Sequence, residues 1–440
     1  MEAKLGALQC HFTWDLDPSR SKLFCLRDKL DDIGTEEGNS WLGHIYNLQG
    51  YIHYQLGFTE DAQCFFSRAA EAFRLIRRSD EGPWLVVNYG NLAWWHYQLG
   101  EQADSQSYLS KVDTLLKEYP SPSEDELHPE IYAEKAWTLM NFGKPHLATD
   151  YFQRAIRMQP DMVEWHTSHT IALVNVYGHP DEQLKIDNMK IAKENDPDNL
   201  YLAALYLQEC AKEVRKSEDE VRELAKRVLR KSTNRYSGIR PDEVCELAEK
   251  VLSNPPNRYS GIRPDEVCEL AEKVLKTPPS SFSGIRPDEV RELAEKVLKK
   301  PRSSSSGIRP DEERELAEEV LKKPPSSYSG IRPLLRLYRI YISLDEAVDL
   351  AEEALKRHPD ERHLKYSAAI CYKWRVYSNK HKPLEQEKID RAISLHEEMI
   401  SLYPDSSLKV KIALANIHAR SNHGQAEADK IYQELLASDL

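Results

Sequence analysis

Three arginines near residue 335 have the charge and the spacing to bind phosphate. Arg332, Arg336 and Arg339 stand at positions i, i+4 and i+7, which share one face if this stretch is helical. A guanidinium group is always charged, and its planar fork of donors matches two phosphate oxygens. A solvated basic helix face has the same pattern and is the commoner case. The residue types therefore allow a phosphate site without requiring one.

The chain lacks the residue patterns that mark common enzymes. It has no GxxxxGK[ST] phosphate loop, no GxGxxG, no HExxH and no GxSxG. Its 15 histidines show no metal-ligand spacing, and its seven cysteines include no CxxC pair. We therefore expect no catalytic residues, no cofactor and no metal site. The cysteines are expected to be small buried thiols in a reducing compartment.

Composition indicates a helix-rich protein of the cytosol. Charged residues make up 30% of the chain and hydrophobic residues 40%, with a mean hydropathy of −0.64. No stretch approaches the ~20 apolar residues of a membrane span, and the start MEAKLGALQC lacks the apolar core of a signal peptide. The net charge of −12 argues against unspecific binding of nucleic acid over the whole surface. A nucleic-acid site would have to be a local basic pocket.

A repeated helix–turn–helix pattern dominates the first half of the chain. In the stretch YNLQGYIHYQLGFTEDAQCFFSRA, Gly50 precedes the turn residue Gly57 by seven positions, and Ala62, Phe66 and Ala69 follow. This spacing is typical of tetratricopeptide repeats, in which small residues let two helices approach closely. The pattern recurs with turn glycines at Gly57, Gly100 and Gly143, and further repeats close at Pro197, Pro359 and Pro404. The fold class predicted is therefore all-α: a tetratricopeptide-repeat superhelix, or α-solenoid.

A shorter repeat interrupts this pattern. Five GIRP tetrads recur every 23 residues, with their glycines at Gly238, Gly261, Gly284, Gly307 and Gly330. Each 23-residue unit, called a tile below, contains one short amphipathic helix such as DEVCELAEKVL, with an apolar stripe at Val244, Leu247, Ala248, Val251 and Leu252. A lone helix of this length is marginal in water, and a Pro/Ser-rich stretch ends each tile. We expect the tiles to loop out or to stack loosely.

Removing Asp242 through Pro333, a segment of 92 residues, restores a continuous repeat pattern. The remaining sequence joins GIRP directly to LLRLYRIYISLDEAVDLAEEAL, so the tiles are an internal expansion. Four segments are predicted. They are an N-terminal helical segment over 1–45, a tetratricopeptide block over 46–230, the tiles over 231–333 and a second tetratricopeptide block over 334–440.

Several sequence runs together resemble the interferon-induced proteins with tetratricopeptide repeats, the IFIT family. They are CHFTW at residues 10–14, GNLAWWHYQLG, WTLMNFGK, NDPDNLYL, RLYRIYISLDEAVDLAEEAL and ICYKW. The resemblance covers nearly the whole chain apart from the extra tiles. It implies a superhelix whose central channel holds the 5′ end of single-stranded RNA. The RNA end recognised would be a triphosphate or an incompletely methylated cap, which marks viral transcripts.

The resemblance also implies roles for particular residues. Arg332 and Arg339 fall where the family keeps channel arginines, whereas Arg240, Arg263, Arg286 and Arg309 are tile copies expected to decorate loops. Asn199 and Tyr201 match a pair near the first nucleotide, and a helix-start Asn and a core Tyr is the equal alternative. Trp137, with Ile171 beside it, matches a residue that stacks on a cap base. A core Trp is the equal alternative for Trp137.

The chain departs from the family at several basic positions. Asn141 stands where the family has a phosphate-binding lysine, and Asn175 where it has a second arginine. Tyr366 and Ser367 replace a His-Gln pair, although Lys365 is adjacent. Loss of two buried charges would weaken triphosphate binding by several kcal/mol.

Two functions remain open from the sequence. The first is a cytoplasmic, interferon-induced antiviral effector of innate immunity that binds the 5′ end of single-stranded RNA. Its RNA-binding residues would be Arg332, Arg336, Arg339, Asn199, Tyr201, Trp137, Ile171 and Lys365. Other IFIT-like proteins are further expected partners, and membranes and DNA are not. The alternative is a protein-interaction scaffold in innate immunity, the common use of tetratricopeptide grooves.

Overall fold

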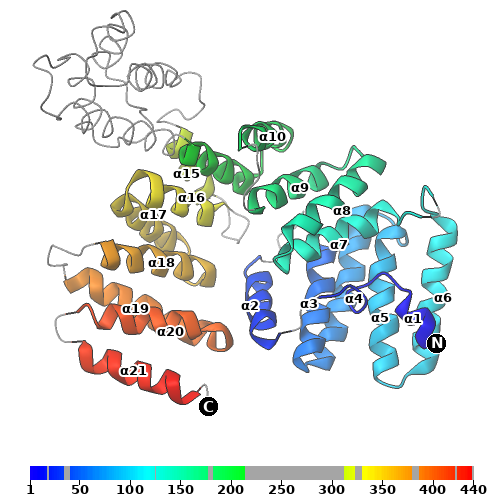
Figure 1. Ribbon diagram of the computed structural model, residues 1–440, viewed down its shortest axis with the longest axis horizontal. Coiled ribbons are helices and arrows are strands. Elements are labelled where there is room, and N and C mark those ends of the chain that lie inside the picture. Colours follow the sequence, from blue (N-terminus) through cyan, green and yellow to red (C-terminus); the bar gives the residue numbers. More distant parts are fainter. Residues whose placement is uncertain are drawn as a thin grey trace, which may run out of the picture. The chain divides into compact units, whose positions relative to one another are not determined.

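The computed structural model describes residues 1–16, 19–33, 40–123, 125–176, 182–213, 312–322, 330–378, 386–421 and 424–438. These ranges are helical with short connections and contain no strand (Figure 1). The predicted all-α class is therefore confirmed. Among these residues, no helix has both the length and the hydrophobicity needed to cross a membrane.

Three helix hairpins follow one another in the N-terminal half and carry the predicted repeats. They are α3 (Leu42–Leu56) with α4 (Thr59–Arg77), α5 (Val86–Gln98) with α6 (Gln102–Glu118), and α7 (Pro129–Asn141) with α8 (Pro145–Met158). The turn of each hairpin contains a predicted glycine with positive φ: 94° at Gly57, 82° at Gly100 and 73° at Gly143. L-amino acids with a side chain rarely adopt this conformation, so glycine ends each first helix there.

Small residues at the predicted positions let the two helices of a hairpin touch. A Cβ added at Gly50 on α3 would lie 2.5 Å from the ring of Phe66 on α4, so no larger residue fits. Ala62, Phe66, Ala148 and Phe152 are completely buried. The aromatic rings therefore fill the spaces that the small residues leave, as the repeat pattern predicts.

Further helices precede and follow these hairpins in the sequence. The described elements are α1 (Glu2–Gly6), α2 (Arg20–Asp31), η1 (Pro83–Leu85), α9 (Val163–Asn175), α10 (Glu182–Asn195), a helical segment over residues 200–213, α15 (Glu312–Lys322), α16 (Ile331–Leu337), η3 (Tyr338–Ile342), α17 (Leu344–Arg357), α18 (Arg362–Ser378), α19 (Gln386–Leu402), η4 (Pro404–Ser406), α20 (Leu408–His418) and α21 (Gln425–Ser438). Helices α18 to α21 continue the sequential packing, with α18 on α19, α19 on α20 and α20 on α21.

The chain divides into two compact units that do not follow the linear order of the predicted blocks. The first comprises Met1–Leu202, Pro325–Ser329 and Arg357–Leu440, so it contains repeats from both ends of the sequence. The second comprises Ala203–Pro324 and Gly330–Lys356 and includes α15, the helix of the last tile. The four-segment division remains a prediction.

One tile helix lies within the described residues and is packed. In α15, Leu316, Ala317 and Val320 occupy the apolar stripe predicted for the tiles, and all three are buried. Helix α15 packs against α16, which begins the repeat that follows. The helix of the last tile therefore packs on the following repeat, which agrees with stacking, one of the two arrangements expected for the tiles. The stripe from Val244 to Leu252 and the arginines at positions 240, 263, 286 and 309 lie outside the described residues.

The five cysteines within the described ranges are free thiols. Cys10, Cys210 and Cys371 are buried, as expected, but Cys25 and Cys64 are exposed. The expectation of uniformly buried thiols is therefore wrong for these two. They lie at solvent-facing positions of α2 and α4, where a small residue fits as well as it does in a core.

Candidate functional site

The three arginines of the proposed phosphate stripe span a change in helix type. Arg332 and Arg336 belong to α16, and Arg339 lies in η3, a π-helical turn. A π-helical turn contains about one residue more than an α-helical turn. The side chain of Arg339 therefore points in a different direction than it would in an unbroken α-helix. Arg336 is exposed, and Arg332 and Arg339 are partly buried. The single α-helical face inferred from the sequence therefore holds only from Arg332 to Arg336.

A second basic group lies on α2 and was missed from the sequence. Lys29 Nζ donates a hydrogen bond of 2.8 Å to Asn141 Oδ1 on α7, and Lys22 Nζ lies 5.4 Å from the centre of the next side chain, the Phe142 ring. Asn141 is 8% exposed, and its Nδ2 donates to the carbonyl of Trp137. The ammonium group of Lys29 thus lies beside Asn141, which stands where the family pattern has a lysine. The seven-residue spacing of Lys22 and Lys29 could have revealed a shared helix face.

Asn199 begins the helical segment over residues 200–213. Its Oδ1 accepts from the backbone N–H of Leu202 at 3.0 Å, and its Nδ2 donates to Asp196 Oδ2 at 2.9 Å. This is the geometry of a helix N-cap, one of the two alternatives that the sequence left open. Tyr201, in the first turn of the same helix, is partly buried.

Trp137 and Ile171 lie in the protein core. Trp137 is 2% exposed and stacks on Trp41 with ring centres 5.8 Å apart. Ile171 is 7% exposed. Protein covers the indole of Trp137, in agreement with the core alternative.

Three further candidate or departing positions form polar contacts within their own helix or with the neighbouring helix. Asn175 Nδ2 donates to the Ile171 carbonyl at 3.0 Å, and Ser367 Oγ donates to the His363 carbonyl at 2.8 Å. Lys365 pairs with Glu398 on the neighbouring helix α19 at 3.0 Å. Each of these polar groups therefore has a partner within the protein.

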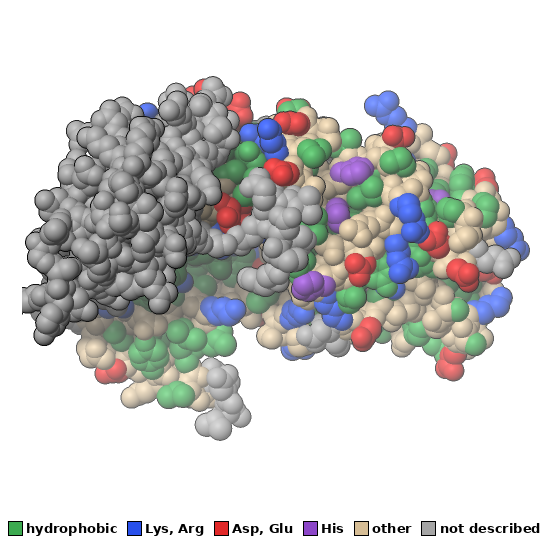
Figure 2. All heavy atoms as spheres, turned by 45° about the horizontal axis from the view of Figure 1, so that its top comes forward, with side chains coloured by type: hydrophobic (Ala, Val, Ile, Leu, Met, Phe, Trp, Pro, Cys, Tyr) green, Lys and Arg blue, Asp and Glu red, His purple; other side chains and the backbone are tan. Residues whose placement is uncertain are grey.

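The candidate residues belong to both compact units. Arg332, Arg336 and Arg339 lie in the unit that contains the tiles. The first unit contains Lys29, Lys22 and the predicted residues Trp137, Ile171, Asn199, Tyr201 and Lys365. Within that unit, Asn141 connects Lys29 to the backbone of Trp137. On the face drawn in Figure 2, basic and acidic side chains are interspersed among the described residues.

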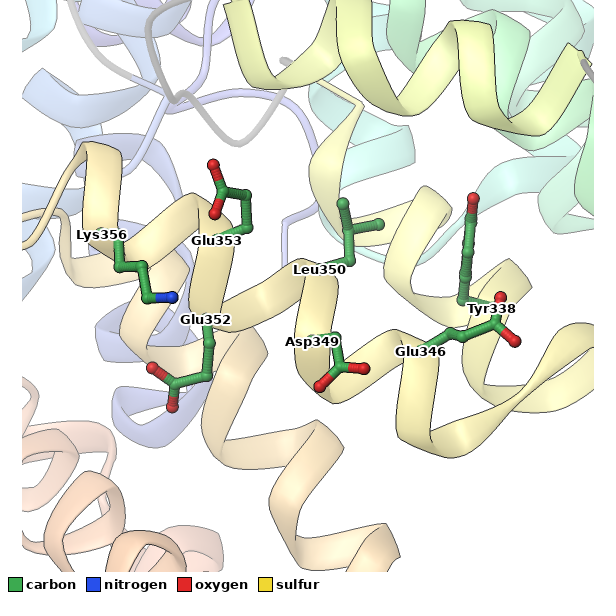
Figure 3. A pocket seen from close by; sticks show the side chains of 7 residues that line it. All are labelled: Tyr338, Glu346, Asp349, Leu350, Glu352, Glu353 and Lys356. Atoms are coloured by element: carbon green, nitrogen blue, oxygen red, sulfur yellow. The ribbon is translucent and has the colours of Figure 1, made fainter.

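A hollow of about 550 Å³ on α17 has the wrong charge for phosphate. Its lining is Tyr338, Glu346, Asp349, Leu350, Glu352, Glu353 and Lys356 (Figure 3). Four carboxylates against one ammonium group repel a polyanion. The hollow is therefore no candidate for an RNA end, although it follows directly after the arginines in the sequence.

The N-terminal segment that contains CHFTW covers part of the first three repeats. The His11 backbone N–H donates to Asn91 Oδ1 on α5, and Asn91 Nδ2 lies 3.0 Å from His11 Nδ1. His11 Nε2 lies 3.1 Å from Thr138 Oγ1 on α7. Because Asn91 Nδ2 can only donate, Nδ1 accepts and the neutral imidazole donates through Nε2. His11 therefore occupies the polar side chains of Asn91 and Thr138.

One small group of possible metal ligands occurs among the described residues. His96, Glu101 and Asp104 have ligand atoms within 4.8 Å of one another at the α5–α6 turn. His96 Nδ1 already hydrogen-bonds to Glu101 Oε2 at 2.6 Å, and both acids are exposed. This arrangement ties the ends of two helices and needs no ion.

Comparison with known proteins gives similarity in sequence and in fold. No protein-family model matches the chain. Interferon-induced protein with tetratricopeptide repeats 3 of Mus musculus is 27% identical over 207 residues, which are 47% of this chain and 51% of that protein. Interferon-induced protein with tetratricopeptide repeats 2 of Homo sapiens is 28% identical over 222 residues, or 50% and 47%. The chain spans about half the length of these curated relatives.

Solved structures match over more of the chain. The human IFIT1 dimer with m7Gppp-AAAA aligns with 99% of this chain and 77% of its own, at 20% identity and a TM-score of 0.58. The human IFIT1 dimer with PPP-AAAA aligns with 99% and 76%, at 19% identity and a TM-score of 0.55. At this identity the match shows the fold, a tetratricopeptide-repeat superhelix.

Proposed function

Because the chain is a relative of the IFIT proteins, we propose that it binds the 5′ end of single-stranded RNA in the channel of its tetratricopeptide superhelix. The observation that carries this proposal is that sequence and fold comparisons converge on one family, while the matched structures hold capped or triphosphate RNA. The proposed role is that of an interferon-induced antiviral effector in the cytoplasm. It involves binding without catalysis, and other IFIT-like proteins are its proposed protein partners.

Two basic groups of this chain support the proposal. Arg332, Arg336 and Arg339 provide guanidinium forks on α16 and η3. Lys29 supplies an ammonium group beside Asn141, where the lysine of the family pattern is absent. Charge-assisted hydrogen bonds from such groups to phosphate oxygens are the strongest polar contacts available. The proposed phosphate-binding residues are therefore Arg332 and Arg339 in one compact unit and, as a separate group, Lys29 in the other.

The alternative of a general protein-interaction scaffold is less well supported. A tetratricopeptide groove binds peptides through free polar side chains on the first helices of its repeats. In this chain Asn91 and Thr138, on two such helices, hydrogen-bond His11 of the chain itself. A peptide would have to displace a segment in which Cys10 and Trp14 are also buried.

Equilibrium binding to three RNAs of one sequence tests the proposal. The RNAs carry a 5′-triphosphate, a 5′ cap or a 5′-hydroxyl, and filter retention reports binding at several salt concentrations. We expect at least tenfold preference for one modified end over the hydroxyl, and weaker binding as salt rises because phosphate contacts release counterions. Equal binding of all three RNAs, or none, would reject the proposal and favour the scaffold.

A further inference from the structure

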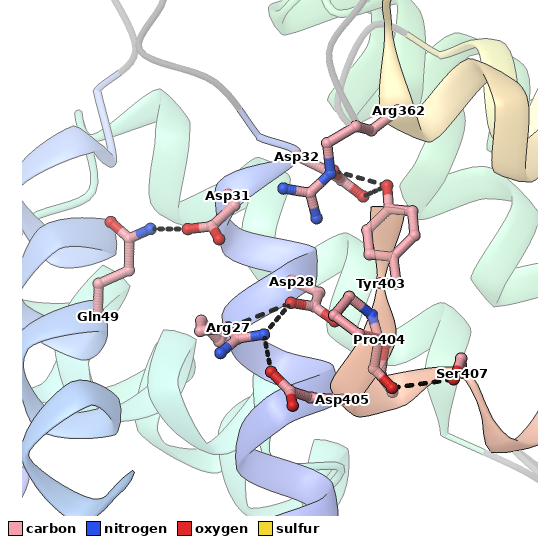
Figure 4. A network of polar contacts seen from close by, with 11 residues as sticks. Arg27, Asp28, Asp31, Asp32, Gln49, Arg362, Tyr403, Pro404, Asp405 and Ser407 are labelled. Carbon is pink, nitrogen blue, oxygen red and sulfur yellow. Dashed lines mark hydrogen bonds and ion pairs between the residues drawn. The ribbon is translucent and has the colours of Figure 1, made fainter. Parts of the chain in front are cut away.

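Helix α2 contacts the C-terminal repeats of the first compact unit through a polar network (Figure 4). Arg27 Nη2 donates to Asp28 Oδ1 at 2.8 Å and to Asp405 Oδ2, in η4, at 3.0 Å. Ser406 Oγ donates to Asp28 Oδ2 at 2.6 Å. These contacts join residues that lie 378 positions apart in the sequence.

Asp32, just after α2, extends the same network. The Tyr403 hydroxyl lies 2.9 Å and 2.8 Å from the two carboxylate oxygens of Asp32. Arg362 Nε lies 3.8 Å from Asp32 Oδ1, and its guanidinium lies 4.2 Å from the centre of the Tyr403 ring. Burial and the Asp32 carboxylate raise the pKa of Tyr403, so its hydroxyl stays protonated and continues to donate.

These contacts are strong because the carboxylates of Asp28 and Asp32 are each only 8% exposed. Hydrogen bonds to a charged group are shorter and stronger than those between neutral groups, and water screens them little at such buried positions. The network therefore stabilises the contact between α2 and the C-terminal repeats.

The remaining faces of α2 bind two other repeats. Gln49 Nε2, on α3, donates to Asp31 Oδ1 at 2.8 Å. Lys29 donates to Asn141 on α7. One helix of 12 residues thus contacts α3, α7 and the segment around η4. The position of Lys29 depends on how α2 is held on its other faces.

We propose that α2 is a strap, fastened by Asp28 and Asp32, that joins the C-terminal to the N-terminal repeats and positions Lys29 for a 5′ phosphate. The joining of the repeats stands independently of RNA. The role of Lys29 rests on the proposed function. In this account Asp28 and Asp32 are positioning residues, because they act on the ligand through Lys29.

The fastening is tested without RNA by hydrogen exchange of the full chain. A double variant with Asp28→Asn and Asp32→Asn removes both carboxylate charges of the polar network around α2. Tyr403→Phe removes only the hydroxyl that donates to Asp32. We expect amide exchange in α2 and in η4–α20 to accelerate at least tenfold in the double variant and less in Tyr403→Phe. Exchange in α5 and α6 stays unchanged, and Asp31→Asn, which faces α3, leaves η4–α20 unchanged. Unaltered exchange in α2, or equal acceleration in α5 and α6, would overturn the strap.

The positioning of Lys29 is tested by a double-mutant cycle with 5′-triphosphate RNA. The variant with both Asp28→Asn and Asp32→Asn should bind this RNA at least fivefold more weakly than the parent chain. A variant with Asp28→Asn and Asp32→Glu, which keeps one carboxylate, should regain part of the lost affinity. In a Lys29→Ala background the same changes should have no further effect, because the group they position is gone. Equal effects in both backgrounds would contradict the positioning role. If the parent chain binds no RNA, the proposed function fails, while the exchange experiment still decides the strap.

Discussion

At the scale of single residues, burial determines the protonation of His11. The ring is 1% exposed, and desolvation lowers its pKa from 6.5 to about 3. The folded pKa lies below the unfolded one, so the unfolded chain binds more protons between these values. The contribution of His11 to stability is therefore complete above pH 6.5 and is lost as the pH falls towards 3.

Replacing His11 by Gln removes this pH dependence. At neutral pH His11→Gln should be less stable than the parent chain because the Asn91 and Thr138 contacts are disturbed. As the pH falls from 6.5 to 3, the difference in unfolding free energy should narrow by about 1.4 kcal/mol per pH unit. Denaturant titrations at several pH values measure it. The buried Glu130, with its pKa raised to about 7, acts in the opposite direction but is common to both proteins. A difference in unfolding free energy between the two proteins that does not change with pH would contradict the lowered pKa of His11.

The basic residues should contribute individually to RNA binding. Arg332→Ala, Arg339→Ala and Lys29→Ala should each weaken binding of the preferred RNA end by about 1–3 kcal/mol, the value of a charged hydrogen bond. Arg263→Ala, a change in an equivalent tile arginine, serves as the control and should have no effect. Fluorescence anisotropy with one labelled RNA measures all four. An effect of Arg263→Ala as large as that of Arg332→Ala would mean that the tile copies also bind RNA.

The sequence indicated which residues could bind RNA, but it did not indicate which neighbours each of them contacts. Trp137 and Asn199 each had two interpretations, and the structure places Trp137 against Trp41 and Asn199 at a helix start. Lys29 was missed because its partner Asn141 is more than a hundred residues away in the sequence. Contacts of this range leave no local pattern, whereas a turn glycine does.

At the scale of elements, the hairpins follow directly from local rules, but the strap and η3 do not. Gly57, Gly100 and Gly143 mark their turns because positive φ is a property of one residue. The π turn at Tyr338–Ile342 interrupts a regular sequence period, and nothing in the residue types signals it. Helix α2 is short and weakly amphipathic, so its position depends on partners in three repeats.

The packing of the last tile helix can be measured by truncating its apolar side. Leu316→Ala should cost about 2–4 kcal/mol of local stability, because the side chain is only 7% exposed and α15 packs on α16. Hydrogen exchange in α15 and α16 should accelerate together. Arg314→Ala, an exposed position on the same helix, is the matched control and should change neither. If Leu316→Ala leaves α16 unaffected, α15 does not support the following repeat.

At the scale of the whole molecule, repeats from the two ends of the sequence form one compact unit while the tiles belong to the other. Neighbour contacts hold a solenoid together, so an insertion between repeats is tolerated only if other contacts join the flanking parts. The contacts of α2 with η4 provide such a connection.

Deletion of Asp242 through Pro333 should therefore preserve the first unit. Arg240 would then precede LLRLYR and take the place of Arg332. We expect thermal unfolding at an equal or higher temperature and RNA affinity at least equal to that of the parent chain. Deletion of one tile, residues 265–287, is the intermediate control. Unfolding of the shortened chain would show that the tiles are a necessary part of the solenoid.

Photo-crosslinking of the first nucleotide tests RNA-end binding and its location together. A single-stranded RNA with a 5′-triphosphate and 4-thiouridine at position one is irradiated with the full chain, and crosslinked peptides are identified by mass spectrometry. We predict crosslinks to at least one of the two basic segments, residues 330–342 with the arginines or residues 20–31 with Lys29, and their loss with the matched 5′-hydroxyl RNA. Crosslinks confined to the tiles or to α17, or equal crosslinking of both RNAs, would contradict the proposed site.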